Sequence, residues 1–263
     1  MVHPDRRRLL TLPLALPALA LPAGARAGLP EVVAVARRAV FPVGTYHALD
    51  NPRFSFRGSG FAVGDGRLLA TNAHVLPEDP AALGRMALLV SAQRTAGADG
   101  AASAPVRKLT LLAQDRTHDL ALLQIDGEPL PALPLAADDS AREGQAVAFI
   151  GFPIGGLLGF SPVTHRGTIS SITPIALPPP NAARLDAAAV ARLRQGVFDI
   201  YQLDGTAYPG NSGGPLLDAD SGEVLGLINM VLVKAGRESL LSQPSGISYA
   251  IPVRFLRALL AAR

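Results

Sequence analysis

Gly-Asn-Ser-Gly-Gly-Pro, at residues 210–215, is the most informative segment of this 263-residue sequence. Taken alone, the segment fits an ordinary flexible turn. Its glycines also allow the backbone around Ser212 to turn so that successive N–H groups point at one spot. Such a spot can hold a negatively charged oxygen, and this makes Ser212 a candidate nucleophile.

Two segments upstream carry the groups that a serine nucleophile needs. His74 lies in T-N-A-H-V at residues 71–75, and Asp119 lies in T-H-D-L-A-L-L at residues 117–123. Either segment alone fits a loop histidine or a strand with an acidic start. A serine hydroxyl is a poor nucleophile at neutral pH and needs a base that takes its proton during attack. Imidazole does this well, and a buried carboxylate fixes its tautomer.

These three residues occur in motifs that resemble a known family. The sequence is similar to the trypsin/chymotrypsin-fold serine proteases, and most similar to the bacterial Deg (high-temperature-requirement) type, over roughly residues 32–257. Further matching motifs are G-S-G-F at 58–61, G-F-P at 151–153, G-E-V-L-G at 222–226 and G-I-S-Y-A-I-P at 246–252. We expect no PDZ module in this chain, although relatives usually carry one. Asn211 stands where digestive relatives have an Asp, so activation by a freed N-terminal amine is not expected.

The resemblance implies a fold and a site. The fold is all-β, with two six-stranded antiparallel β-barrels, a short N-terminal helix and a C-terminal helix. His74 would be the general base, Asp119 would orient it and Ser212 would be the nucleophile. The backbone N–H groups of Gly210 and Ser212 would form the oxyanion hole.

The substrate pocket is the least determined part of the site. Trypsin-like relatives that bind Lys or Arg have an Asp six residues before the serine, where this chain has Thr206. A basic P1 residue is therefore not expected, and we expect small or medium apolar P1 residues. The residues expected to line the pocket are Thr206, Leu227, Ile228, Asn229, Ile247 and Ser248.

Two other functions compete with a serine endopeptidase. The serine motif also fits the G-x-S-x-G elbow of α/β-hydrolases, but that fold requires a histidine after the serine, and none follows Ser212. A protease-like scaffold that binds peptides without cutting them stays open. His118, next to Asp119, is a weak alternative base, because neighbouring side chains on an extended segment point to opposite sides.

The pattern along the chain favours many short strands separated by turn residues. The first barrel is expected at about 40–134, the second at about 144–252 and the C-terminal helix at 253–263. Residues 31–39 and 187–195 also read as helices. The long stretch 174–197, with three prolines at 178–180, fits a lid over the cleft, an exosite or a neutral surface insertion. Strands are expected at 58–63, 67–71, 86–91, 106–113, 120–125, 146–151, 165–173, 198–203, 214–218, 224–233 and 247–251.

Composition narrows the chemistry. The chain has no cysteine, so disulfides, thiolate zinc sites and thiol catalysis are excluded. Its five histidines show no metal-binding spacing, and no metal or cofactor is expected. Residues 1–27 hold four arginines and one acid. The rest of the chain has 20 basic and 20 acidic residues, so their formal charges cancel. We therefore expect polypeptide substrates and no nucleic-acid partner; the oligomeric state is not predicted.

Residues 1–27 read as an export signal. Arg6, Arg7 and Arg8 precede an apolar run from Leu9 to Pro22, and Ala25 to Ala27 form an A-x-A cleavage site. The run is shorter than a membrane-spanning helix and contains two prolines. We expect residues 28–263 to be the mature domain, periplasmic or secreted and without stable membrane insertion, by the general or the twin-arginine route. An uncleaved anchor is the alternative.

Overall fold

The computed structural model describes residues 28–90, 105–138, 140–153, 160–176, 197–229 and 246–263. The expected export signal at 1–27 and the expected helix at 187–195 lie outside these residues. The same holds for residues 177–196 of the expected lid. Within the described residues, no helix is long and apolar enough to cross a membrane.

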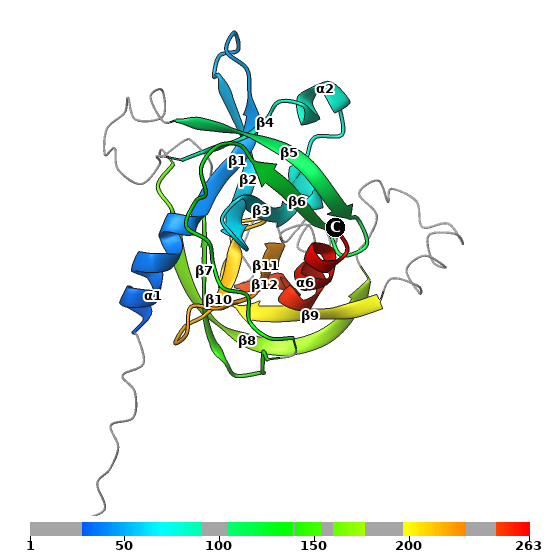
Figure 1. Ribbon diagram of the computed structural model, residues 1–263. Coiled ribbons are helices and arrows are strands. Elements are labelled where there is room, and N and C mark those ends of the chain that lie inside the picture. The colour runs from blue at the N-terminus through cyan, green and yellow to red at the C-terminus, as the bar shows by residue number, and fades with distance from the viewer. Residues whose placement is uncertain (1–27, 91–104, 139, 154–159, 177–196, 230–245) are drawn as a thin grey trace, which may run out of the picture.

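Two closed six-stranded antiparallel barrels make up the fold, as the sequence predicted. The first has the strand order β1-β2-β3-β6-β5-β4 and the second the order β10-β11-β12-β9-β8-β7. In Figure 1 the first barrel lies above the second. The first barrel contains β1 (Val40–Tyr46), β2 (Phe54–Val63), β3 (Leu68–Asn72), β4 (Met86–Leu89), β5 (Val106–Asp115) and β6 (Leu120–Ile125). The second contains β7 (Ala146–Gly151), β8 (Val163–Ala176), β9 (Val197–Asp204), β10 (Pro215–Asp218), β11 (Val224–Asn229) and β12 (Ile247–Pro252).

Short helices and 3-10 turns flank the strands of the two barrels. The N-terminal helix α1 (Leu29–Ala36) continues into the 3-10 turn η1 (Arg37–Ala39), and α2 (Pro80–Leu83) precedes β4. The 3-10 turn η2 (Ala73–Val75) follows β3 and carries His74. The C-terminal helix α6 (Val253–Ala261) lies where the two barrels meet, in contact with β5 and β6 of the first and β11 and β12 of the second (Figure 1).

A shared core joins the barrels. One hydrophobic cluster fills the first barrel alone, and a larger one includes Phe61 and Leu120 of the first barrel together with Phe149 and Ile228 of the second. The connector between the barrels is tied to both, because the N–H of Leu133 donates to Ala62 O and the connector pairs with Val224 of β11. Apolar burial of this kind stabilises a domain by roughly 25 cal/mol per Å². The shared core therefore fixes the first barrel relative to the second.

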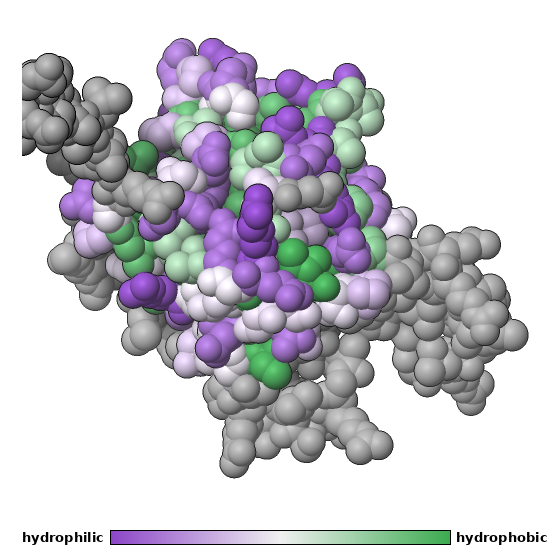
Figure 2. Space-filling view, turned by 90° about the horizontal axis from the view of Figure 1, so that it is seen from below, coloured by the Kyte–Doolittle hydropathy of each residue, from purple (hydrophilic) through white to green (hydrophobic). Residues whose placement is uncertain are grey.

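The surface of the second barrel is mostly polar where it is described. Figure 2 shows this face from below, with apolar residues scattered among polar ones. Single exposed apolar residues are normal on a soluble domain. This face therefore offers no large apolar patch within its described part.

Candidate active site

Asp119 is held in a tight turn between β5 and β6. It is the one non-glycine residue with a left-handed backbone, φ 54°, in the described part of the chain. Asp tolerates this conformation better than most residues, because its short polar side chain can hydrogen-bond locally. Asp119 as a whole is only 9% exposed, and the turn directs its carboxylate toward η2 and β11.

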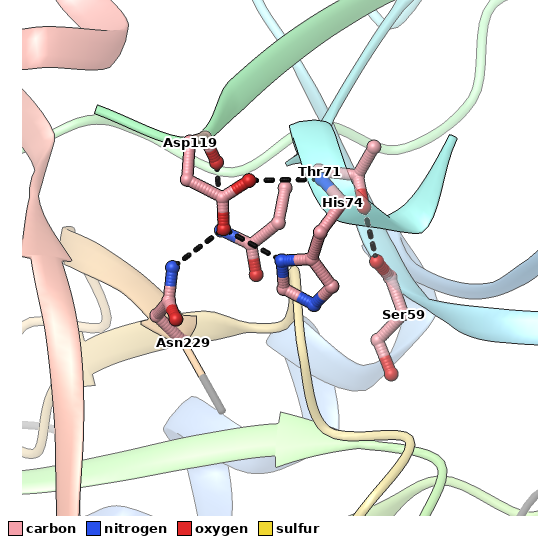
Figure 3. A network of polar contacts seen from close by, with 6 residues as sticks. Ser59, Thr71, His74, Asp119 and Asn229 are labelled. Carbon is pink, nitrogen blue, oxygen red and sulfur yellow. Dashed lines mark hydrogen bonds and ion pairs between the residues drawn. The ribbon is translucent and has the colours of Figure 1, made fainter. Parts of the chain in front are cut away.

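Three donors converge on this carboxylate (Figure 3). Its Oδ1 accepts the backbone N–H of His74 at 2.8 Å, and its Oδ2 lies 2.6 Å from His74 Nδ1. The amide of Asn229 donates to the same Oδ2 at 2.7 Å. In addition, the Asn72 amide and the Ala73 N–H both donate to the Asp119 carbonyl. These contacts fix the position of the carboxylate and the orientation of the His74 ring.

Ser212 belongs to the turn 208–214, here named the serine loop, at the mouth of the second barrel. Ser212 is 6% exposed, and its carbonyl accepts the N–H of Ser59 from the first barrel at 2.8 Å. A Cβ at Gly213 would strike Ser59 O and Thr71 Oγ1, so only glycine allows the loop to approach β2 and β3 this closely. The loop is thereby placed beside the strand that leads into His74.

Ser59 is the main contact between the first barrel and the serine loop. Its hydroxyl donates to Gly210 O at 2.7 Å and accepts the N–H of Phe152 at 3.0 Å. The Ser59 carbonyl in turn accepts the hydroxyl of Thr71 at 2.7 Å (Figure 3). All of these atoms belong to buried residues or to the loop itself, so the loop backbone is anchored on both barrels.

The backbone of the serine loop leaves two N–H groups available. The N–H groups of Asn211, Gly213 and Gly214 donate to carbonyls of Tyr208, Ile228 and Asn211. Those of Gly210 and Ser212 donate to no atom of the described residues. Gly210 has φ 103°, a backbone conformation that favours glycine over other residues. Two free N–H groups on either side of one residue can bind a small anionic oxygen.

The turn η2, which carries His74, lies close to Ser212, because a Cβ at Gly58 would stand 2.8 Å from the Val75 side chain and 3.0 Å from Ser212 O. Among the described residues no hydrogen bond joins the His74 ring to the Ser212 hydroxyl. In proteins without bound substrate such bonds are often long and tighten only in the complex. The His74 ring is partly exposed, with 27% of its side-chain surface accessible, so a substrate can reach it.

The residues expected to line the substrate pocket lie in different surroundings. Thr206 is partly exposed and Ile247 is 40% exposed. Ser248 is buried and braces the segment around Thr206, because its hydroxyl accepts the Ala207 N–H and donates to Gly205 O. Leu227 and Ile228 are fully buried in the shared core. Asn229 is fully buried, and its amide is engaged with Asp119.

The recorded contacts of His118, the alternative base, are with Asp115, Phe198 and Phe255 and not with Ser212. Its Nδ1 lies 2.6 Å from Asp115 Oδ2, and its ring stacks on Phe255 of α6 with centroids 3.9 Å apart. His118 and Asp119 lie in a turn rather than on an extended strand, and the left-handed Asp119 separates their side chains. His118 therefore anchors the turn to the C-terminal helix.

The sequence analysis missed supporting roles that the structure makes visible. Ser59 and Asn72 lie inside quoted motifs but received no role, and Asn229 was placed in the pocket. A usable signal existed for Asn229, since it is a polar residue at the end of the buried apolar strand β11. Buried amides need hydrogen-bond partners, and a nearby carboxylate is a strong one.

Comparison with known protein families agrees with this fold. The model of the trypsin-like peptidase domain matches residues 58–227. The chain belongs to the trypsin-like peptidase family. The matched residues of this trypsin-like peptidase domain include His74, Asp119 and Ser212.

Two relatives of this trypsin-like peptidase domain are described as DegP-like and HTRA2 serine proteases. The chain is 31% identical over 196 residues to a "Probable periplasmic serine endoprotease DegP-like" of Halomonas elongata, covering 74% of this chain and 32% of that protein. It is 30% identical over 209 residues to "Serine protease HTRA2, mitochondrial" of Drosophila pseudoobscura pseudoobscura, covering 80% and 39%. The chain thus spans about a third of the length of the curated relatives it matches.

Solved structures agree with the trypsin-like fold. "HtrA-type protease AlgW with tripeptide" superposes with a TM-score of 0.59 at 25% identity, over 90% of this chain and 63% of that one. A serine endoprotease from Yersinia pestis gives a TM-score of 0.59 at 23% identity, over 90% and 66%, which supports the fold alone.

Proposed function

We propose that this chain is a serine endopeptidase that hydrolyses peptide bonds of exported or unfolded proteins through His74, Asp119 and Ser212. The observation that carries the proposal is the contact of His74 Nδ1 with Asp119 Oδ2 at 2.6 Å, together with a serine loop whose Gly210 and Ser212 N–H groups donate to no atom of the described residues. Membership in the trypsin-like peptidase family supports it. The similarity to a probable periplasmic DegP-like endoprotease supports action outside the cytosol.

The geometry suggests how the first half of the reaction proceeds. The Ser212 hydroxyl attacks the substrate carbonyl while His74 Nε2 takes its proton. Asp119 keeps the other ring proton on Nδ1 and stabilises the imidazolium that forms. The carbonyl oxygen becomes negative and is bound by the N–H groups of Gly210 and Ser212. The amine then leaves with the proton from His74, and an acyl group stays on Ser212.

The second half repeats these steps with water. His74 takes a proton from a water molecule, which attacks the acyl carbonyl. The same N–H groups hold the negative oxygen, and the acid product leaves as Ser212 regains its proton. Thr206 is partly exposed and uncharged, and Ser248 holds the segment next to it through the Ala207 N–H. Because no carboxylate stands at this position, the pocket takes small or medium apolar P1 residues and not Lys or Arg.

Hydrolysis of unfolded casein tests the proposal. Ser212→Ala should lower the rate on the order of 10⁴-fold or more, because the nucleophile is lost while the fold is kept. Ser55→Ala is the matched control, since Ser55 is exposed on β2. An unchanged rate in Ser212→Ala would contradict the assignment. Wild-type protein that binds casein without cutting it would favour the scaffold function instead.

A further inference from the structure

The side chain of Asn211, directly before the candidate nucleophile, is buried with very little polar contact. Asn211 is fully buried, and its Oδ1 has no hydrogen-bond partner within the described residues. Its Nδ2 lies 3.4 Å from Nε2 of His165. A Cβ at Gly151 would lie 2.7 Å from Oδ1, so the amide is wedged between Gly151 and His165. Because a buried amide without partners is costly, the His165 contact matters to this side chain.

His165 is held rigidly in its place on β8. It pairs with Phe149 across the β7–β8 ladder, and its ring stacks on the Phe149 ring with centroids 4.7 Å apart and planes 15° apart. The ring of Tyr208, at the start of the serine loop, lies 5.9 Å away. His165 thus touches both ends of the segment from Tyr208 to Asn211.

Asn211 is the central residue of the candidate oxyanion hole. Its own N–H donates to Tyr208 O and its carbonyl accepts the N–H of Gly214, so its backbone is tied within the serine loop. The free N–H groups of Gly210 and Ser212 lie on either side of it. The Ser212 N–H belongs to the peptide that follows Asn211, and the Gly210 N–H belongs to the peptide that precedes Gly210. The position of the Asn211 side chain therefore bears directly on the first donor and, through Gly210, on the second.

We propose that His165 is a positioning residue for the serine loop. In its neutral form its Nε2 accepts a hydrogen bond from the Asn211 amide and keeps the Gly210 and Ser212 N–H groups aimed at one point. Protonation of His165 at acid pH removes this acceptor and releases the loop. The inference rests on the proposed function, because it assigns His165 a part in the same reaction.

The surroundings of His165 favour the neutral ring. Burial lowers the pKa of His165 below its ordinary value of 6.5. The groups recorded against the ring are Phe149 from β7 and Tyr208 and Asn211 from the serine loop, and only Tyr208 among them can titrate. None of the ion pairs in the described part of the chain includes His165. Arg166, the next residue on β8, points to the other side of the sheet.

The sign of the pH effect follows from this. Above about pH 6.5 the ring is neutral in the folded and the unfolded chain, and Nε2 is available as an acceptor. As the pH falls below that value, the unfolded chain takes up the proton first, and the folded site loses its hydrogen bond only when its lower pKa is passed. Both nitrogens of the protonated ring are donors, so Nε2 then faces the Asn211 NH₂ group without an attraction.

Two substitutions of His165 separate the acceptor from the ring. His165→Phe keeps an aromatic ring against Phe149 and removes the acceptor, whereas His165→Gln places an amide oxygen near the position of Nε2 and does not titrate. With a chromogenic peptide we expect a kcat about tenfold lower for His165→Phe, with KM changed less than about twofold, and most of kcat restored in His165→Gln. The loss is smaller than the 10²–10³-fold fall on removing a whole oxyanion donor, because the donors are misaimed rather than absent.

The pH profile distinguishes positioning from simple packing. The ratio of wild-type kcat to that of His165→Gln should stay constant near neutral pH and fall only as the pH passes the pKa of the folded His165, which burial lowers below 6.5. Both proteins contain His74, so effects of His74 cancel in this ratio. His47→Gln, on the exposed β1–β2 loop, should give a flat ratio. A ratio for His165→Gln that stays flat from neutral pH down to the lowest pH at which the protein remains folded, or an unchanged kcat in His165→Phe, would overturn the inference.

A readout without catalysis keeps this test separate from the proposed function. In ¹⁵N-labelled Ser212→Ala protein, the Gly210 backbone amide and the Asn211 side-chain amide should shift with the same midpoint as the His165 ring. Both shifts should vanish in Ser212→Ala/His165→Gln. A Gly210 amide that ignores the His165 titration would refute the inference, whereas wild-type protein without hydrolytic activity would refute only the proposed function.

Discussion

Substitution of Ser59 by alanine tests how the first barrel holds the serine loop. The Ser59 hydroxyl is fully buried, donates to Gly210 O at 2.7 Å and accepts the Phe152 N–H at 3.0 Å. Ser59→Ala leaves one carbonyl and one N–H without this partner in a buried place. Each such group costs about 1–3 kcal/mol, so the free energy of unfolding should fall by about 2–6 kcal/mol.

Activity should fall together with stability in this variant. Without the Ser59 hydroxyl the Gly210 carbonyl loses its anchor, so Gly210 can change conformation. The adjoining Pro209–Gly210 peptide, which carries the Gly210 N–H, then loses its fixed orientation toward the oxyanion position. We expect kcat for a peptide substrate to fall by about 10- to 100-fold, which is less than the effect of losing an entire oxyanion donor. KM should change little, since Ser59 lies beneath the loop and not against the substrate.

Urea unfolding followed by circular dichroism, together with steady-state kinetics, measures both effects. Ser55→Ala is the matched control, because Ser55 lies on the same strand but is exposed. Its stability should change by less than about 0.5 kcal/mol, as for most surface substitutions. If Ser59→Ala unfolds and turns over substrate like the wild type, the anchoring role of Ser59 is wrong.

Three other changes have defined outcomes. Asn229→Ala removes a charge-assisted hydrogen bond to Asp119 worth about 1.5–3 kcal/mol, so kcat/KM should fall about 10- to 150-fold; an unaltered value would contradict the role of Asn229. Gly213→Ala places a Cβ against first-barrel atoms at φ 82° and should cost more than about 3 kcal/mol in urea unfolding. Burial raises the pKa of the Asp218 carboxyl, but hydrogen bonds from a neighbouring amide and its own turn lower it below its ordinary value overall. This stabilisation is lost on acidification, so Asp218→Asn should lose less unfolding free energy than wild type below about pH 4.

Much of the barrel architecture was predictable from the sequence, because most strands are short apolar runs between turn residues. The runs at 120–125 and 146–151 coincide with β6 and β7. Strand β1 was missed, since Val40–Tyr46 contains Pro42 and Gly44, and both residue types are disfavoured inside strands. In the fold β1 pairs with β2 and β4, and the pairing shifts register next to Gly44. Long-range pairing thus overrides the local preference.

The sequence predicted those residues of the candidate site whose side chains carry out chemistry, but not the partners that position them. His74, Asp119 and Ser212 stand out because their motifs supply a base, a carboxylate and a glycine-flanked hydroxyl. The contact of Asn229 with Asp119 joins residues 110 positions apart, so no local pattern indicates it. The same holds for Ser59 and Gly210, and for His165 and Asn211. These partners are set by how the two barrels and the serine loop pack together.

Covalent labelling of Ser212 tests the central claim most directly. A fluorophosphonate reacts with a serine only when a base and an oxyanion hole activate it. Mass spectrometry of the treated wild-type protein should locate a single adduct on the peptide that contains Ser212, and His74→Ala should abolish it. A wild-type protein that stays unlabelled, or that is labelled equally in His74→Ala, would contradict the assignment of His74, Asp119 and Ser212 as a catalytic unit.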